Sequence, residues 1–431
     1  MARKKKTINV KETEYYQYAK GVIDGSIVAG ELVKLACKRF MSDLERPDLE
    51  FRAEIVDRFI TFCSLLKHFK GKSAGEQFIL EPWEQFIGAN ILGFYYKGTN
   101  DRKYTNSLIC VSRKNGKSCY AAAFCLWFLI GDGESGAEVD LAANSRQQAT
   151  IAYEFCANYA KQLDPSGKEL KILRNGIKLK LNDSNLNVFA ADSTKLDGFN
   201  ASFALIDEYH AAKDSRLYDV LKSSQGQRKN PHLMVISTVG FSITSPFKKL
   251  YDTDCEILHG IKQDDSTFAM IFALDDGDDW RDEKVWRKIA PNLDITITTK
   301  YLREQVIQAE NNISAETGIL VKNFNVWQQV TNIWIPDSYV NRCFRKISYS
   351  DFNEDTSLCY VGTDLAAVGD MTAVSCLFTR DDDDKLYFIT EYFLPETALT
   401  ESPNRELYKQ WKRQGLLTIT EGNVTDYVYV T

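Results

Sequence analysis

The stretch Asn106-Ser-Leu-Ile-Cys-Val-Ser-Arg-Lys-Asn-Gly-Lys-Ser118 decides the fold of this chain. Four β-forming residues, 108–111, lead into a polar turn, and the turn ends shortly before the helix-forming run Ala121-Ala-Ala123. Strand, loop and helix in this order predict a phosphate-binding loop. A turn that opens onto a helix N-terminus aims backbone N–H groups and the positive end of the helix dipole at an anion.

The end of this loop resembles the pattern G-x-x-x-x-G-K-[ST], in which the lysine contacts the β- and γ-phosphates of a nucleotide and the hydroxyl binds Mg²⁺. These roles fall to Lys117 and Ser118, but Val111 stands in place of the first glycine. The match therefore depends on context, because an ordinary helix start on a surface loop has the same G-K-S. The residues expected around the phosphates are Ser112, Arg113, Lys114, Asn115, Gly116, Lys117 and Ser118.

Two further apolar strands end in polar groups. Residues 202–206 are followed by Asp207 and Glu208, which are suited to hold Mg²⁺ and to polarise an attacking water, respectively. A core strand followed by a solvated acidic turn explains this segment equally well by itself. Residues 233–236 are followed by Ser237 and Thr238, where a γ-phosphate sensor is expected. The three strand ends together favour a P-loop NTPase.

With these motifs in place, the chain resembles the large terminase subunit of tailed phages and prophages, from about Phe78 to the C-terminus. The resemblance is carried by the variant loop 112–118, by Leu196-Asp197-Gly198, by the run Ile206-Asp-Glu-Tyr-His210, and by Ser237-Thr238 as the coupling motif. It implies an α/β fold, with a P-loop (RecA/ASCE-like) ATPase on a parallel sheet followed by an RNase H-like nuclease. It also implies ATP-driven movement of double-stranded DNA into a procapsid and metal-dependent cleavage of concatemeric DNA.

The partners and cofactors implied by the resemblance are a small terminase subunit, a portal protein, ATP with Mg²⁺, and Mg²⁺ or Mn²⁺ in the nuclease. A ring of about five copies on the portal is expected, with a monomer possible in isolation. Two alternatives stay open. One is a helicase-like or repair ATPase, although no second G-K-[ST] loop is present. The other is an inactive prophage remnant that serves as a binding scaffold.

Composition agrees with a globular chain of two or three domains, with 431 residues, 44% hydrophobic and 26% charged. No stretch reaches the roughly eighteen apolar residues of a membrane span, so we expect a protein of the host cytoplasm. The ten cysteines lack C-x-x-C spacing, which favours reduced core thiols. The net charge of −6 leaves only local basic surfaces for DNA phosphates.

Residues 1–75 are expected to form an N-terminal helical segment packed on an ATPase domain of residues 76–333. Phe78-Ile-Leu-Glu-Pro-Trp-Glu-Gln85 matches the adenine-binding motif of the family, with Gln85 pairing to adenine and Trp83 stacking on or supporting it. A helix N-terminus with Pro82 in its first turn and the tryptophan in the core fits as well. Residues 240–330 look acidic and helical and show no chemical motif.

Strands that alternate with helices, such as 139–143 before a helix starting near Ser145, predict a parallel sheet with its site at the carboxyl ends of the strands. An ATPase motor also needs a cation at the transferring phosphoryl group. Arg113 is the choice within the loop. For a donor from a neighbouring subunit the choices are Arg146, Lys195 and Arg216, and plain surface charge is the alternative for each.

Residues 334–431 are expected to form the nuclease domain, starting near Trp334-Ile-Pro336. Strands at 358–365, 371–378 and 385–393 predict an antiparallel meander, and Asp364 and Asp370 match the metal-binding pattern of the family. Such nucleases hold two metal ions about 3.5–4 Å apart between clustered carboxylates. Because few acids follow before Thr431, and Asp426 is not assigned, we expect a truncated domain with weak or absent nuclease activity.

Overall fold

The computed structural model describes residues 8–190, 200–328, 342–366, 371–402 and 404–430. The chain divides into two compact units, Met1–Ile333 and Trp334–Thr431. Four features singled out in the sequence lie outside the described residues: Lys195, Leu196-Asp197-Gly198, Trp334-Ile-Pro336 and Asp370.

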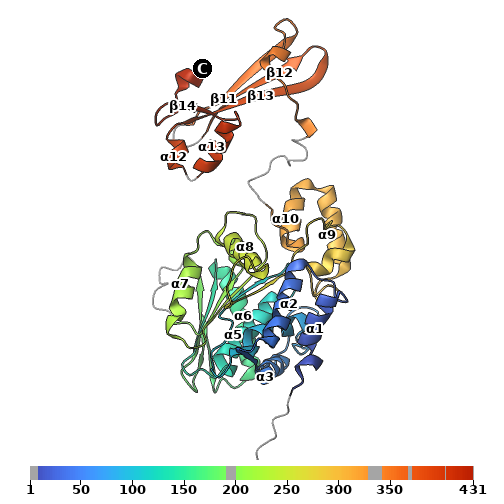
Figure 1. The fold of residues 1–431 in the computed structure, drawn as a ribbon, viewed down its shortest axis with the longest axis vertical. Helices are drawn as coiled ribbons and strands as arrows, with labels where there is room; N and C mark the ends of the chain where they lie inside the picture. The colour runs from blue at the N-terminus through green and yellow to red at the C-terminus, as the bar shows by residue number, and fades with distance from the viewer. Residues whose placement is uncertain (1–7, 191–199, 329–341, 367–370, 403, 431) are drawn as a thin grey trace, which may run out of the picture. The chain divides into compact units, whose positions relative to one another are not determined.

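The first unit is built on an eight-stranded sheet in the order β10-β3-β9-β8-β4-β7-β6-β5 (Figure 1). The strands are β3 (Asn106–Cys110), β4 (Glu138–Ala143), β5 (Leu170–Leu173), β6 (Gly176–Leu179), β7 (Asn185–Ala190), β8 (Phe203–Asp207), β9 (His232–Ser237) and β10 (Thr267–Ile271). From β10 to β7 all neighbours are parallel, which confirms the predicted parallel sheet, and β6 and β5 add an antiparallel edge. The strand β10 lies in a region expected to be helical, and that expectation was wrong there.

Helices cover both faces of this sheet. Successive residues of a strand point to opposite faces, and here both sets of side chains are apolar and buried. Leu205 packs into the core below α1–α6, whereas its neighbour Ile206 packs into a second core with α7 and α8. The helices are α1 (Glu14–Asp24), α2 (Glu31–Glu45), α3 (Ala53–Ser64), α4 (Pro82–Gly93), α5 (Lys117–Leu126), α6 (Arg146–Leu163), α7 (Arg216–Ser224) and α8 (Pro246–Leu258).

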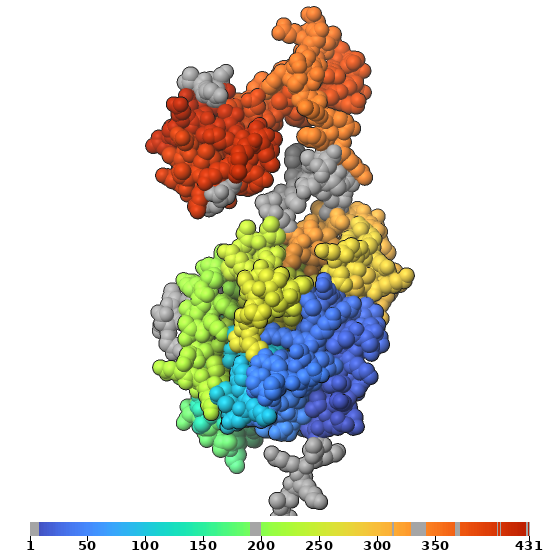
Figure 2. All heavy atoms as spheres, viewed as in Figure 1, coloured from blue at the N-terminus to red at the C-terminus, as the bar shows by residue number. Residues whose placement is uncertain are grey.

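Residues 10–64 are mostly helical, in agreement with the predicted helical segment, and these helices share one hydrophobic core with the sheet. Figure 2 shows their blue surface continuous with the rest of the first unit. One feature was not predicted, namely the antiparallel pair of β1 (Leu49–Phe51) and β2 (Phe94–Tyr96). The short helical turns of this unit are η1 (Val10–Glu12), η2 (Trp127–Gly131), η3 (Tyr209–Ala211), η4 (Gln225–Gln227) and η5 (Glu283–Lys288).

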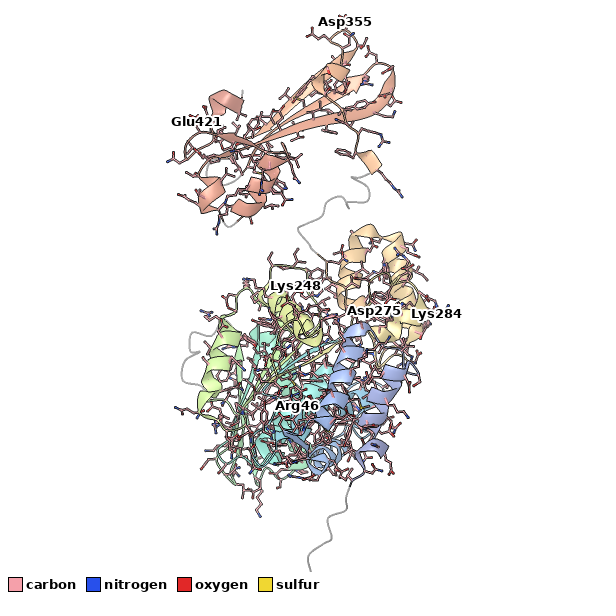
Figure 3. The ribbon with its side chains drawn as sticks, in the orientation of Figure 1. Arg46, Lys248, Asp275, Lys284, Asp355 and Glu421 are labelled. Atoms are coloured by element: carbon pink, nitrogen blue, oxygen red, sulfur yellow. The ribbon has the colours of Figure 1, made fainter. Side chains whose placement is uncertain are left out.

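Residues 274–326, which we call the 274–326 segment, add a third core to the first unit. It contains η5 and the paired helices α9 (Thr299–Asn311) and α10 (Ile313–Phe324), with Trp286 and Phe324 buried between them. Asp275, labelled in Figure 3, accepts the N–H of Glu31 at the start of α2 (2.6 Å) and pairs with Lys288. The segment is therefore attached to the N-terminal helices.

The second unit is a four-stranded sheet in the order β11-β12-β13-β14. The strands β11 (Ser357–Asp364), β12 (Thr372–Arg380) and β13 (Asp383–Pro395) form the predicted antiparallel meander, and β14 (Thr418–Thr420) pairs in parallel with β13. Asp355 and Glu421 lie near opposite ends of this unit (Figure 3). Its helical elements are η6 (Tyr349–Asp351), α12 (Ala398–Glu401), α13 (Arg405–Arg413) and α14 (Tyr427–Val430).

All ten cysteines are free, and five of them are buried, so the predicted core position holds for half of them. Among the described helices, none has the length and apolar character needed to cross a bilayer.

The buried His232 at the start of β9 supports a prediction about stability and pH. Its Nδ1 lies 3.1 Å from the carbonyl of Tyr104 and its Nε2 lies 2.8 Å from the Ser107 hydroxyl. Burial lowers the pKa of His232 to about 3, so the folded protein keeps the ring neutral. The unfolded chain protonates the ring below about pH 6.5. The contribution of His232 to stability is therefore complete above pH 6.5 and is lost as the pH falls toward 3.

We expect the advantage of the wild type over His232→Gln in free energy of unfolding to shrink by about 2 kcal/mol between pH 7 and pH 5, at about 1.36 kcal/mol per pH unit below 6.5. Urea unfolding of both proteins at the two pH values measures this difference. An advantage that is equal at both pH values contradicts the prediction.

Candidate functional site

The loop between β3 and α5 closes around the ammonium group of Lys117. This group donates to the carbonyls of Val111 (3.0 Å) and Ser112 (3.4 Å), and the side chain is only 7% exposed. Lys117 is the first residue of α5, and its N-cap Gly116 has a φ of 83°. Lys114 also has a positive φ, of 73°. Left-handed residues in such turns create concave arrangements of N–H groups that bind anions.

Val111 takes the place of the first glycine of the phosphate-loop pattern, and the structure explains why a β-branched residue is accepted there. Val111 is fully buried, and its N–H donates to the carbonyl of Ser237 on β9 (3.1 Å). The positive φ values of this loop fall at Lys114 and Gly116 instead. The backbone at Val111 therefore continues the strand and does not require glycine.

The 274–326 segment holds the loop from outside, which sequence reasoning missed. The Ser112 hydroxyl donates to the carbonyl of Ile289 (2.9 Å). Asn292 donates twice to Asn115, from its backbone N–H to Oδ1 (3.0 Å) and from Nδ2 to the carbonyl (3.2 Å). The Oδ1 of Asn292 in turn accepts from the indole N–H of Trp83 (2.7 Å). Asn292 therefore links α4 to the phosphate loop.

These contacts also show the surroundings of Trp83, for which an adenine motif and a helix N-terminus with a core tryptophan were compatible expectations. The indole is 3% exposed and packs edge-on against Phe272, so it lies in the core and supports the loop. Pro82 is the first residue of α4, as the second interpretation required. Gln85 donates its amide N–H to the carbonyl of Leu80 (2.9 Å). Its pairing with adenine stays a prediction.

Glu84 is a buried acid beside the loop that sequence reasoning also missed. Its Oε2 accepts the N–H of Glu81 (2.9 Å), and the two glutamates form a capping box at the start of α4. Burial raises the pKa of Glu84 to about 8, against the opposing effect of that backbone hydrogen bond. The Glu84 carboxyl is therefore protonated over much of the neutral range.

The two acids after β8 have opposite protonation behaviour. Burial, then the charge of Glu208, raises the pKa of Asp207 to about 7, and Lys117 opposes this shift. Burial acts in the same direction on Glu208, but His210 and Lys117 outweigh it and lower the pKa of Glu208 to about 2. Burial lowers the pKa of Lys117 itself, while both acids favour its charged form. Glu208 is thus the ionised member of the acid pair.

The backbone of Glu208 is fixed on both sides. Its φ and ψ of 52° and 46° are left-handed, which is uncommon for a residue with a side chain. Its N–H donates to the carbonyl of Ile236 on β9 (2.9 Å), and its carbonyl accepts from Nδ2 of Asn144 at the end of β4 (2.7 Å). Strained backbone of this kind clusters at functional sites.

The groups at this edge of the sheet fit a Mg²⁺ ion. Asp207 is a carboxylate only 6% exposed, and Ser118 is the second residue of α5. The buried Oδ1 of Asn144 has no hydrogen-bond partner among the described residues. Mg²⁺ prefers oxygen ligands and is commonly bound by one or two protein groups together with substrate phosphates. Asp207 and Ser118 are the residues predicted to hold it.

The predicted coupling pair lies beside these acids. Ser237 ends β9 and Thr238 follows it, and both are buried. The next residue, Val239, donates its N–H to Oδ1 of Asn325 (2.9 Å), and Nδ2 of Asn325 donates to the carbonyl of Phe272 after β10 (2.7 Å). Asn325 therefore joins the ends of β9 and β10, and sequence reasoning missed it.

The predicted cations are exposed where the structure describes them. Arg113 lies in the phosphate loop, and its charge contributes to the lowered pKa values of Glu208 and Lys117. Arg146 and Arg216 are exposed first residues of α6 and α7. Lys195 lies outside the described residues. The charge of Arg113 therefore acts on the acid Glu208.

The second unit presents its predicted acid differently. Asp364 is the exposed last residue of β11. The hydroxyl of Tyr427 donates to the carbonyl of Ala366 (2.5 Å), which brings α14 to the same end of the sheet. Within the described residues, no three His, Cys, Asp or Glu side chains are grouped to hold a metal ion. Asp370 lies outside them, so the structure does not bring Asp364 together with a second predicted ligand.

Two family models match successive parts of the chain. Residues 82–254 match the ATPase domain of the terminase large subunit, and residues 261–431 match its endonuclease domain. The second match begins within the first unit, so it includes β10 and the 274–326 segment.

Curated relatives agree with these matches. Protein YmfN of Escherichia coli (strain K12) is 28% identical over 252 residues, which are 54% of this chain and 53% of that protein. The terminase large subunit of Enterobacteria phage HK97 is 24% identical over 395 residues, 88% of this chain and 73% of that protein. That of Lactococcus phage p2 is 21% identical over 342 residues, 78% and 61% of the two chains. This chain thus spans about half to three quarters of the length of these relatives.

Among solved structures, the crystal structure of the HK97 bacteriophage large terminase has a TM-score of 0.55 at 22% identity. The similarity covers 87% of this chain and 76% of that one. At this level of identity it establishes a shared fold.

The contacts of Asn292 lead to a prediction about nucleotide affinity. The Asn292→Ala variant lacks the side-chain hydrogen bonds that join residue 292 to Asn115 and Trp83. Part of the nucleotide-binding energy must then be used to order the phosphate loop. We expect MgADP to bind roughly tenfold more weakly, about 1.4 kcal/mol. Isothermal titration calorimetry measures this, with Asn311→Ala on the exposed end of α9 as the matched control. Equal affinities in wild type and folded Asn292→Ala contradict the prediction.

Proposed function

The chain belongs to the terminase large subunit family, and from this premise we propose that it is an ATP-hydrolysing motor that moves double-stranded viral DNA into a procapsid. One observation supports the motor site above others. Lys117 at the start of α5, and Asp207 and Glu208 at the end of β8, influence one another electrostatically at the carboxyl edge of the parallel sheet. This is where ligands bind in open α/β sheets.

The residues around this edge divide the work of ATP hydrolysis. Lys117 exchanges its two carbonyl acceptors for the β- and γ-phosphates of ATP. Ser118 and Asp207 hold Mg²⁺, which when bound neutralises charge on the β- and γ-phosphates. Glu208, ionised and fixed by its backbone contacts, accepts a hydrogen bond from the attacking water and orients it. Ser237 and Thr238 couple hydrolysis to movement.

A cation is also needed on the transferring phosphoryl group. We assign Arg113 to this role in cis, because its charge already acts on Glu208 and Lys117. Arg146, Lys195 and Arg216 are the choices for a donor from a neighbouring copy. Such a donor requires an assembled ring of about five copies, with a portal protein and a small terminase subunit as further partners.

For the second unit we propose metal-dependent cleavage of concatemeric DNA, with Asp364 as a metal ligand and Asp370 as a second. A two-metal nuclease needs several clustered carboxylates. The described part of this unit offers Asp364 without such a cluster, so we assign to Asp364 the binding of a metal ion and no further step. The endonuclease family match over residues 261–431 supports the proposal.

The motor proposal is tested by steady-state ATP hydrolysis with and without linear duplex DNA. We expect Glu208→Gln to lower kcat by roughly 10²–10⁴-fold, because the water then lacks an anionic acceptor. The matched control is Glu304→Gln on the exposed surface of α9, which leaves kcat unchanged. Equal background rates in wild type and Glu208→Gln mean that the chain is a remnant or that the site is assigned wrongly.

The nuclease proposal is tested by nicking of supercoiled plasmid with Mn²⁺. We expect weak cleavage, because Asp364 is not joined by a described carboxylate cluster, and we expect the remaining activity to disappear in Asp364→Asn. The control is Asp355→Asn at the far end of the same unit (Figure 3). Cleavage that persists in Asp364→Asn contradicts the assignment of Asp364, and robust cleavage that Asp364→Asn abolishes contradicts the expected weakness.

A further inference from the structure

His210 lies between the catalytic glutamate and the coupling pair. It belongs to η3, two residues after Glu208, and its side chain is 13% exposed. Its Nδ1 is 3.0 Å from Oε2 of Glu208 and 3.1 Å from the Ser237 hydroxyl. The Thr238 hydroxyl is 3.4 Å from the same nitrogen, and the backbone N–H of His210 donates to Ser237 Oγ (3.1 Å).

The partners of Nδ1 of His210 are side-chain oxygens of Ser237, Thr238 and Glu208. The Ser237 hydroxyl donates to the carbonyl of Thr238 (2.8 Å), so its oxygen is left to accept. The neighbouring Glu208 carboxylate is an acceptor as well. Ser237 Oγ and Oε2 of Glu208 are therefore the oxygens that a proton on Nδ1 would face.

Packing keeps His210 in this place. Gly240, in the turn after β9, lies so close that an added Cβ would be 3.2 Å from Cβ and 3.3 Å from the carbonyl oxygen of His210. The turn that follows the coupling pair therefore rests on η3. The backbone of Glu208 is fixed by Ile236 and Asn144, so the position of its carboxylate depends on the side-chain dihedral angles and on the groups around it. The side chain of His210 lies 3.0 Å from this carboxylate.

We propose that His210 is a positioning residue that links the orientation of the Glu208 carboxylate to the position of Ser237 and Thr238. When Ser237 and Thr238 move, the imidazole of His210 moves with them and changes the orientation of the Glu208 carboxylate. The rate of ATP hydrolysis therefore depends on the position of Ser237 and Thr238. This inference rests on the proposed ATPase function. It assigns to His210 no contact with nucleotide or metal.

The test is ATP hydrolysis by His210→Ala, His210→Asn and His210→Leu, each with MgADP affinity measured by calorimetry. Asparagine places an N–H donor close to the position of Nδ1, whereas alanine and leucine have none. We expect a loss of at least tenfold in kcat for alanine and leucine, unchanged KM and nucleotide affinity, and recovery of most of the activity with asparagine. A merely structural role predicts that leucine, which fills the space, performs as well as asparagine, and that result overturns the proposal.

A double-mutant cycle with Ser237→Ala adds a second test. If His210 acts through its link to Ser237, the double variant loses no more kcat than His210→Ala, because residues that act as a unit are not additive. If the losses of kcat in the two single variants multiply in the double variant, the proposed link between His210 and Ser237 is wrong. Wild-type hydrolysis that depends on Glu208 but not on His210 overturns this inference and leaves the proposed function standing. Absence of Glu208-dependent hydrolysis overturns both.

Discussion

A buried ammonium group is the constraint on which the rest of the first unit depends. Lys117 is almost fully enclosed, and a buried charge is tolerated only when it is paired and hydrogen-bonded. Two loop carbonyls accept from it, and Asp207 and Glu208 supply the compensating charge. The loop, the end of β8 and the helix α5 must therefore meet at one place. Parallel strands meet this requirement because their carboxyl ends share one edge.

The 274–326 segment, which is distant in sequence, completes this arrangement. Asn292 fixes the phosphate loop to α4, and Asn325 fixes the turn after β9 to the end of β10. Each asparagine is buried and uses both its donor and its acceptor. A buried amide with all its partners satisfied stabilises one arrangement of the elements that it joins. The nucleotide edge is therefore a product of the whole unit.

The two units present their acids in opposite ways. Asp207 and Glu208 are held in a desolvated edge, where burial and neighbouring charges separate their pKa values. Asp364 ends a strand whose residues are mostly exposed, and the apolar side chains Leu358, Tyr360 and Phe388 on its sheet are more than half exposed. Acids tuned by burial are typical of a site that is already formed. In the second unit the described residues show the strand framework without such tuning.

The sequence by itself determined the features that depend on neighbouring residues. The run from Asn106 to Ser118 specified strand, loop and helix, and apolar runs ending in Asp207 and Ser237 specified the polar strand ends, because strand patterns and helix starts are local. Only the tertiary structure decided that Trp83 supports the phosphate loop and that β10 joins the sheet. It also decided that Asn292 and Asn325 fix the loop and the turn at the nucleotide edge of this sheet. Asn292 bonds to Asn115 across 177 residues, and such a pairing leaves no local pattern in the sequence. The sequence around an asparagine in a turn is the same whether the side chain caps that turn or bonds to a distant loop. Only the three-dimensional structure therefore shows its role.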